Sequence, residues 1–121
     1  MAELLTLFVH DPGFFGDRLG EIATARLPRA TRADVERSHR ATFSPLSPPV
    51  HFDEAALATI TQPTLVVHGD DDKIVPLAAG RYFAQNLPNA RLEVFGDTGH
   101  WLQIEQGPTF AALLRAFLGD T

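Results

Sequence analysis

Two short apolar runs lie in the second half of the chain, and each one ends at a glycine. The first is Thr64–His68, which follows Pro63 and stops at Gly69, and the second is Arg91–Phe95, which stops at Gly96. Runs rich in β-branched and aromatic residues with such borders predict strands. Between the runs, apolar side chains recur at helical spacing, at Leu77, Phe83, Ala84 and Leu87. The pattern therefore predicts a strand, a helix and a second strand.

A strand–helix–strand unit of this kind is almost always parallel and right-handed. The carboxyl ends of its strands then lie at one edge of the sheet, where ligand chemistry gathers. Asp70, Asp71 and Asp72 follow the first predicted strand, and His100 follows the second. The order of elements therefore predicts that an acid and an imidazole share this edge.

The first half of the chain has the periodicity of helices. Apolar residues share one helical face near the start and again over residues 18–27, where Asp17 is placed as an N-cap and Pro28 as the end. Thr31 is expected to open a third helix, with Asp34 in position for a capping box. We therefore expect three consecutive helices in the first part of the chain.

The clearest change in composition is SPLSPP at residues 44–49, which predicts a stiff, extended linker. We place the domain boundary there, with a helical segment and linker at residues 1–49 and an α/β core portion at residues 50–121. Asp53 is expected to cap a short helix that precedes the first strand. The last helix, after Pro108, is expected to bury one apolar side, formed by Phe110, Leu113, Leu114, Phe117 and Leu118.

Composition narrows the classes of function. The 121 residues carry a formal net charge of -5, with Lys73 as the only lysine, which argues against a nucleic-acid surface. The chain has no cysteine, and this excludes disulfides, a thiol nucleophile and thiolate metal sites. The opening MAELLTLFV is too short to span a bilayer. We expect a cytoplasmic protein with no membrane partner.

The acid and the histidine can be interpreted in two ways. A histidine beside Gly99 in a strand-end loop can project its ring into a cleft, where a carboxylate orients one nitrogen and the other acts as a base. Asp72 is the best orienting partner, because Gly69 allows a sharp turn before it; Asp70 and Asp71 are expected to be solvated. The alternative is that His100 is a structural loop histidine, although the strand–Asp–helix–strand–His order favours catalysis.

Residues 64–118 resemble the carboxyl-terminal part of an α/β-hydrolase. HGDDDKIVP places the acid of that family's catalytic triad at Asp72, and GDTGHW places its base at His100. The stretches LFVHDPGFF and VFGDTGHWLQIEQ are similar to the meta-cleavage-product hydrolases, which cut carbon–carbon bonds in dienoate products of aromatic-ring opening. The resemblance implies a partial α/β-hydrolase fold in which the early helices belong to a lid over the active site.

The resemblance also implies where a small carbonyl substrate would be bound, namely at Trp101, Arg26 and Phe14. The alternative for Trp101 and Phe14 is packing in the core. The family usually carries a lid arginine that meets the substrate carboxylate, and an ungapped comparison puts Ala23 at that position with Arg26 one turn away. No cofactor is expected. No metal site is expected either, because the three aspartates lack the alternating acids and distal glutamate of a calcium loop.

The nucleophile of a serine hydrolase is missing from this sequence. The family places its serine in a G-x-S-x-G turn, where backbone N–H groups stabilise the developing oxyanion. The serines of this chain are Ser38, Ser44 and Ser47, none of which has flanking glycines, and all of which precede the first predicted strand. The chain alone should therefore have little hydrolytic power.

Three hypotheses follow from these observations. In the first, the chain contributes Asp72 and His100 to a hydrolase whose serine is supplied elsewhere, through self-association or a partner that carries the nucleophile. In the second, it is a catalytically inactive remnant that acts as a folded interaction or dimerisation module. In the third, Met1 is an internal methionine of a longer gene product. An exposed edge on a short sheet favours association in the first two cases.

Overall fold

The computed structural model describes residues 2–43 and 53–119. Its carboxyl-terminal part begins with α4 (Glu54–Ala58) and continues through β1 (Thr64–Gly69), α5 (Leu77–Asn86) and β2 (Ala90–Phe95). Asp53 caps α4 as the sequence predicted, since its side chain accepts a hydrogen bond of 2.6 Å from the Ala56 N–H.

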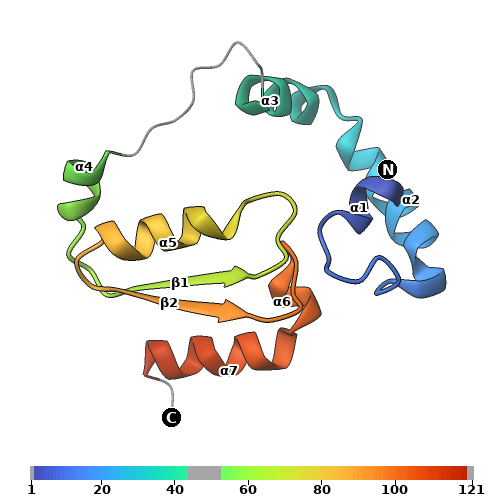
Figure 1. The fold of residues 1–121 in the computed structure, drawn as a ribbon. Helices are drawn as coiled ribbons and strands as arrows, with labels where there is room; N and C mark the ends of the chain where they lie inside the picture. Colours follow the sequence, from blue (N-terminus) through green and yellow to red (C-terminus); the bar gives the residue numbers. More distant parts are fainter. Residues whose placement is uncertain (1, 44–52, 120–121) are drawn as a thin grey trace.

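The two strands pair in parallel, with Thr64 opposite Ala90 and Gly69 opposite Phe95. This confirms the predicted strand–helix–strand unit, and the partial α/β architecture is the one that the sequence indicated. Both strands run toward the same end of the sheet, so the segments that follow Gly69 and Phe95 emerge side by side (Figure 1). The segment after β1 is the acid turn, residues 70–76, and the segment after β2 is the histidine loop, residues 96–101.

Helices cover the two faces of this small sheet unequally. α5 lies along one face, while α6 (Leu102–Glu105) and α7 (Gly107–Leu118) lie toward the other (Figure 1). The expectation of a buried side on α7 is wrong for this chain, because none of its residues is buried and Leu118 is 68% exposed. Two strands offer too little apolar surface to cover a helix of this length.

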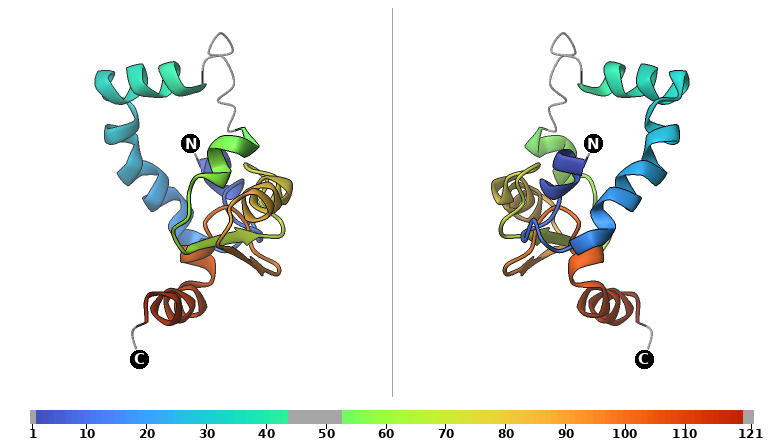
Figure 2. Two further views of the ribbon diagram at one scale, coloured as in Figure 1. Left: turned by 90° about the vertical axis from the view of Figure 1, so that its left-hand side faces the viewer. Right: turned by 90° about the vertical axis from the view of Figure 1, so that its right-hand side faces the viewer.

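The amino-terminal part consists of α1 (Ala2–Thr6), the 3₁₀ turn η1 (Gly16–Arg18), α2 (Leu19–Ala30) and α3 (Ala33–Phe43). Figure 2 shows α2 and α3 extending away from the sheet. We call these two helices the arm. The boundary residues 44–49 lie outside the described residues, and the division at residue 49 stays a prediction.

Three expectations about the helix ends in the arm are wrong. α2 continues through Pro28 to Ala30, because a proline in the last turn of a helix removes only one backbone hydrogen bond. Thr31 closes α2 instead of opening α3, since its hydroxyl and its N–H both donate to the Leu27 carbonyl, at 2.9 and 3.0 Å. Asp17 makes no side-chain cap, and α2 begins after Arg18.

The amino-terminal part meets the sheet through a short turn segment, Phe8–His10. The Trp101 N–H donates to the Phe8 carbonyl at 2.8 Å, and Val9 is completely buried. A Cβ atom at Gly99 would lie only 2.7 Å from the Val9 carbonyl carbon, so glycine permits this close approach. The histidine loop therefore packs directly against the start of the chain. Among the described residues, no helix has the length and apolar character needed to cross a membrane.

Candidate active site

The acid turn fixes the carboxylate of Asp72 through backbone hydrogen bonds. Its Oδ1 accepts from the N–H groups of Ile74 and Val75, both at 2.8 Å. The side chain is only 6% exposed, although it sits just past the end of β1. Because Oδ1 is held by the turn itself, Oδ2 is left to face the neighbouring histidine loop.

His100 meets that free oxygen, with 2.8 Å between its Nδ1 and Asp72 Oδ2. A carboxylate can only accept, so Nδ1 carries the proton and a neutral ring presents the lone pair of Nε2. The His100 side chain is 32% exposed, and within the described residues its Nε2 has no hydrogen-bond partner. The structure thus brings Asp72 and His100 together in the geometry of an orienting acid and an available base.

Burial and hydrogen bonding act in opposite directions on Asp72. Burial raises the pKa of its carboxyl group, but the N–H groups of Val75 and Ile74 and the ring of His100 outweigh it. The pKa of Asp72 therefore lies below its ordinary value of 3.8. The carboxylate stays ionised at neutral pH, which favours the protonated Nδ1 of His100 and stabilises the imidazolium that forms when Nε2 takes up a proton.

Close backbone contact holds the acid turn and the histidine loop in register. The Asp71 N–H donates to the Thr98 carbonyl at 3.0 Å, and the Thr98 N–H donates to Asp70 Oδ1 at 3.3 Å. A side chain at Gly69 would overlap the carbonyl oxygens of Thr98 and Gly99. The glycine at the end of β1 is therefore required by this contact, and Asp70 has a structural partner that its place in the sequence did not indicate.

Glu105, at the end of α6, ties the histidine loop to the start of the chain and was not singled out from the sequence. Its Oε1 accepts from the Gly99 N–H at 2.8 Å, and its Oε2 accepts from the His10 N–H at 2.7 Å. The only sequence signal is an acid one helical turn after Trp101. One carboxylate thus positions the residue before His100 and the segment that packs beside it.

A second histidine–aspartate pair lies beside the first. His10 Nδ1 is 2.9 Å from Asp71 Oδ2, and the Lys73 ammonium lies 3.4 Å from the same oxygen. The hydrogen bond from His10, aided by Lys73, holds the pKa of Asp71 below its ordinary value. Asp71 is 44% exposed, as expected of a turn acid, and it also bridges to the amino-terminal segment.

His68, at the end of β1, contacts two residues of the acid turn. Its ring is 11% exposed, and its Nε2 lies 2.9 Å from the Val75 carbonyl and 3.6 Å from Asp72 Oδ2. Because the carbonyl only accepts, Nε2 carries the proton. Gly80 of α5 leaves room for the ring, since a Cβ there would be 2.9 Å from His68 Nδ1.

Aromatic rings lie near His100. The Phe8 ring is 5.5 Å from the His100 ring and stacks on Trp101 at 4.7 Å. The Arg26 guanidinium carbon lies 4.6 Å from the centre of the Trp101 ring. Trp101 and Arg26 also line a pocket of about 400 Å³ together with Phe14, which is 43% exposed. The structure therefore gathers all three sequence-predicted substrate residues around one pocket.

The structure also describes the position expected for a lid arginine and the side chains that could bind a metal. Ala23, at the position expected for a lid arginine, is buried in α2, while Arg26 reaches the Trp101 ring from the next turn. Across residues 2–43 and 53–119, no group of three or more histidine or acidic side chains could hold a metal ion.

Comparison with known proteins supports the same interpretation. A family model described as the alpha/beta hydrolase fold matches residues 3–106. The chain is 38% identical over 124 aligned residues to a 2-hydroxymuconate semialdehyde hydrolase of Pseudomonas putida, and the match covers 99% of this chain and 43% of that protein. The chain thus spans less than half the length of this relative.

Solved structures show the same likeness in three dimensions. A serine hydrolase from the polyaromatic-hydrocarbon-degrading bacterium Cycloclasticus zankles superposes with a TM-score of 0.87 at 30% identity, over 98% of this chain and 43% of that one. The meta-cleavage product hydrolase of Pseudomonas fluorescens IP01 superposes with a TM-score of 0.80 at 29% identity, over 99% and 44%. By sequence and by fold, this chain belongs to the α/β-hydrolase family.

Proposed function

We propose that this chain supplies the orienting acid and the general base of a hydrolase that acts on a small carbonyl substrate. The observation that carries the proposal is the 2.8 Å hydrogen bond between Asp72 and His100, which leaves Nε2 of the histidine available to a substrate. In this role, Nε2 takes the proton of a serine hydroxyl or a water molecule as that oxygen attacks the carbonyl carbon. Asp72 then stabilises the imidazolium.

The substrate class we favour is a dienoate produced by aromatic-ring opening. The support comes from relatives named 2-hydroxymuconate semialdehyde hydrolase and 2-hydroxy-6-oxononadienedioate/2-hydroxy-6-oxononatrienedioate hydrolase. Trp101 and Phe14 offer flat apolar surfaces to a conjugated chain, and Arg26 offers a positive charge within the same pocket. The bond cleaved would be a carbon–carbon bond or an ester.

The nucleophile must come from outside these 121 residues, because no G-x-S-x-G sequence occurs among them. The apolar surfaces of the chain favour association with a segment that carries it. Val94 of β2 is 43% exposed, and α7 buries none of its residues. A complementing α/β portion would cover this surface and extend the sheet.

Complementation tests the proposal. The chain is co-expressed with the amino-terminal part of the Pseudomonas putida relative, and hydrolysis of 2-hydroxymuconate semialdehyde is followed after the assembly has been isolated. We expect activity that falls about 10⁴-fold in Asp72→Asn and at least as far in His100→Ala. Arg91→Ala removes only an exposed ion pair with Glu93 and is the control.

Two results would contradict the proposal. One is an isolated assembly without hydrolysis, and the other is hydrolysis that survives His100→Ala. The second candidate, a non-catalytic interaction module, is favoured by the same exposed apolar surface. A tight assembly with no activity in any variant would support that candidate.

A further inference from the structure

Two imidazole rings face the carboxylate of Asp72, and the proposed function uses only one of them. His100 Nδ1 lies 2.8 Å from Asp72 Oδ2, and His68 Nε2 lies 3.6 Å from the same oxygen. The His68 side chain is 11% exposed, and its Nε2 proton is already donated to the Val75 carbonyl. His68 therefore offers no base to a substrate, and any part that it plays in the reaction must pass through its neighbours.

The acid turn is poorly packed at the two residues that hold Asp72. Ile74 and Val75, whose N–H groups donate to Asp72 Oδ1, are 41% and 36% exposed. Apolar burial therefore does little to fix their backbone. The Val75 carbonyl accepts from His68 Nε2 at 2.9 Å, and this bond ties the turn to β1. His68 thus restrains the residue that in turn restrains the carboxylate.

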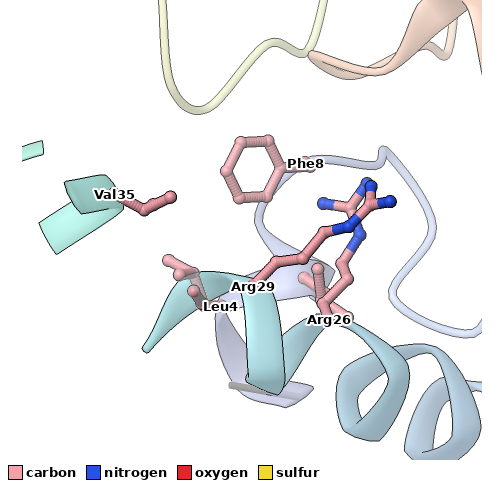
Figure 3. Close-up of a pocket in the computed structure, with 7 residues that line it drawn as sticks. Leu4, Phe8, Arg26, Arg29 and Val35 are labelled. Carbon is pink, nitrogen blue, oxygen red and sulfur yellow. The ribbon is translucent and has the colours of Figure 1, made fainter. Parts of the chain in front are cut away.

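The aromatic neighbour of His100 is a weaker restraint on its ring. The Phe8 ring lies 5.5 Å from the His100 ring and is tilted by 57° to it. Phe8 also borders a pocket of about 380 Å³, and Figure 3 shows its ring reaching into the space between Val35 and the side chains of Arg26 and Arg29. A ring beside empty space lacks packing partners on that side. The direction of the His100 ring therefore depends chiefly on Asp72.

The place of Asp72 Oδ2 decides which nitrogen of His100 carries the proton. While Oδ2 accepts from Nδ1, the lone pair of the neutral ring stays on Nε2. If the acid turn relaxes and Oδ2 moves away, the proton can move to Nε2, and the ring then presents no base. The hydrogen bond from His68 to the turn therefore has a chemical consequence at His100.

We propose that His68 is a positioning residue, which holds the acid turn through the Val75 carbonyl and so keeps Asp72 Oδ2 on Nδ1 of His100. This inference rests on the proposed function, because such a role matters only if His100 acts as a base. The two rings must then carry their protons on opposite nitrogens, His68 on Nε2 and His100 on Nδ1. Neither proton position requires a nucleophile, so both can be measured in the 121-residue chain.

Long-range ¹H–¹⁵N NMR of the full chain, in alkaline buffer where both rings are neutral, tests the inference. We expect opposite tautomers in the parent. In His68→Phe, which keeps a flat ring and loses the donor, part of the His100 population should carry its proton on Nε2. In His68→Gln, whose amide nitrogen can replace the ring Nε2 as donor, His100 should keep its proton on Nδ1. His39→Phe, the same change at an exposed position of α3, is the matched control and should leave His100 as in the parent.

Kinetics of the complemented assembly give a second measurement. The kcat of His68→Phe should fall about 10- to 100-fold, because the base is misplaced, while KM changes less than about twofold. His68→Gln should restore most of the lost kcat, which a purely structural role of the ring would not predict. An inactive parent assembly would contradict the proposed function, whereas the tautomers would still show whether His68 holds Asp72 in place.

Two results would overturn the inference while His100 keeps its Nδ1 proton in the parent. One is a His68 proton on Nδ1, and the other is an unchanged His100 tautomer in His68→Phe. If His68→Phe does not keep the native spectrum, Gly80→Ala takes its place, since a Cβ there would lie 2.9 Å from His68 Nδ1 and displace the ring. Part of the His100 population should then move its proton to Nε2, and an unchanged tautomer would count against the inference.

Discussion

The acid turn and histidine loop differ from the arm in how they are held. In the first region, Asp72, Glu105 and the backbone of Thr98 all make hydrogen bonds that join segments far apart in the chain. In the arm, Ala23 is the only buried residue of α2, and every described side chain of α3 is exposed. The candidate catalytic pair is thus held by the strand–helix–strand unit with its two loops and by the Phe8–His10 segment. α2 and α3 contribute little.

This difference teaches that the contacts that hold His100 and the charged groups of the arm are separable in this chain. The contacts that hold His100 and its loop come from the acid turn, from Glu105 of α6 and from the Phe8–His10 segment. Arg26, which the proposed function gives to the substrate, stands on α2, where Ala23 is the only buried residue. Changes in the first region should therefore alter stability, and changes in the arm should alter binding.

The largest effect is expected from Gly69→Ala. A Cβ atom there would overlap the Thr98 and Gly99 carbonyl oxygens, and backbone on both sides leaves no room for relief. We expect the free energy of unfolding to fall by about 3 kcal/mol or more, as measured by urea denaturation. Gly20→Ala in α2, where an added Cβ would meet open space, is the control and should be neutral or slightly stabilising. A Gly69→Ala variant as stable as the parent would contradict the close contact.

A smaller loss is expected from Glu105→Gln. The carboxylate accepts from both Gly99 and His10, whereas the amide of glutamine offers one acceptor oxygen and a donor in place of the other. We expect a loss of about 1–3 kcal/mol. Hydrogen exchange should show that one of the two amides, at Gly99 or His10, loses its protection while the other keeps it.

Glu93→Gln is the matched control, because Glu93 makes only an exposed pair with Arg91. It should change stability by less than about 1 kcal/mol. Unchanged protection at both Gly99 and His10 in Glu105→Gln would show that Glu105 does not hold the loop.

The fall in the free energy of unfolding at acidic pH, which is the acid limb of the stability–pH curve, should depend on Asp72. Its folded pKa lies below 3.8, so the unfolded chain binds more protons in acid. The stabilisation is therefore fully present above about pH 5 and is lost as the pH falls through 3.8 toward the folded pKa. Urea denaturation between about pH 3 and 7 should give a shallower acid limb in Asp72→Asn than in the parent. An acid limb of equal slope in the two proteins would mean that Asp72 is not held as an ionised partner of His100.

Much of the sheet unit could be predicted from local sequence. Pro63 and Gly69 marked the first strand and Gly96 marked the second, and a parallel connection placed Asp72 and His100 at one edge, as the 2.8 Å distance bears out. This worked because the determining signals lie within a few residues of each element. The catalytic and substrate roles of these residues, and a cytoplasmic location, stay predictions.

The supporting contacts could not be predicted, because they join residues remote in sequence. Nothing near Glu105 indicates that its carboxylate accepts from His10, which is 95 residues away. Asp71 was expected to be solvated, and only the folded chain brings His10 and Lys73 to it. Pro28 was expected to end α2, but a proline removes only the hydrogen bond of its own N–H, and the local sequence does not show that the helix continues past it to Ala30.

The smallest effect is expected in the arm, and a pair of identical substitutions measures the contrast directly. Val9 is completely buried beside Gly99, whereas Val35 of α3 is 39% exposed. Val9→Ala removes buried methyl groups and should cost about 2 kcal/mol. Val35→Ala removes the same atoms from a partly solvated site, and the better helix propensity of alanine offsets part of the loss, so stability should change by less than about 0.5 kcal/mol. Equal losses in the two variants would mean that the arm is held as firmly as the histidine loop, because only a buried valine can lose so much on truncation to alanine.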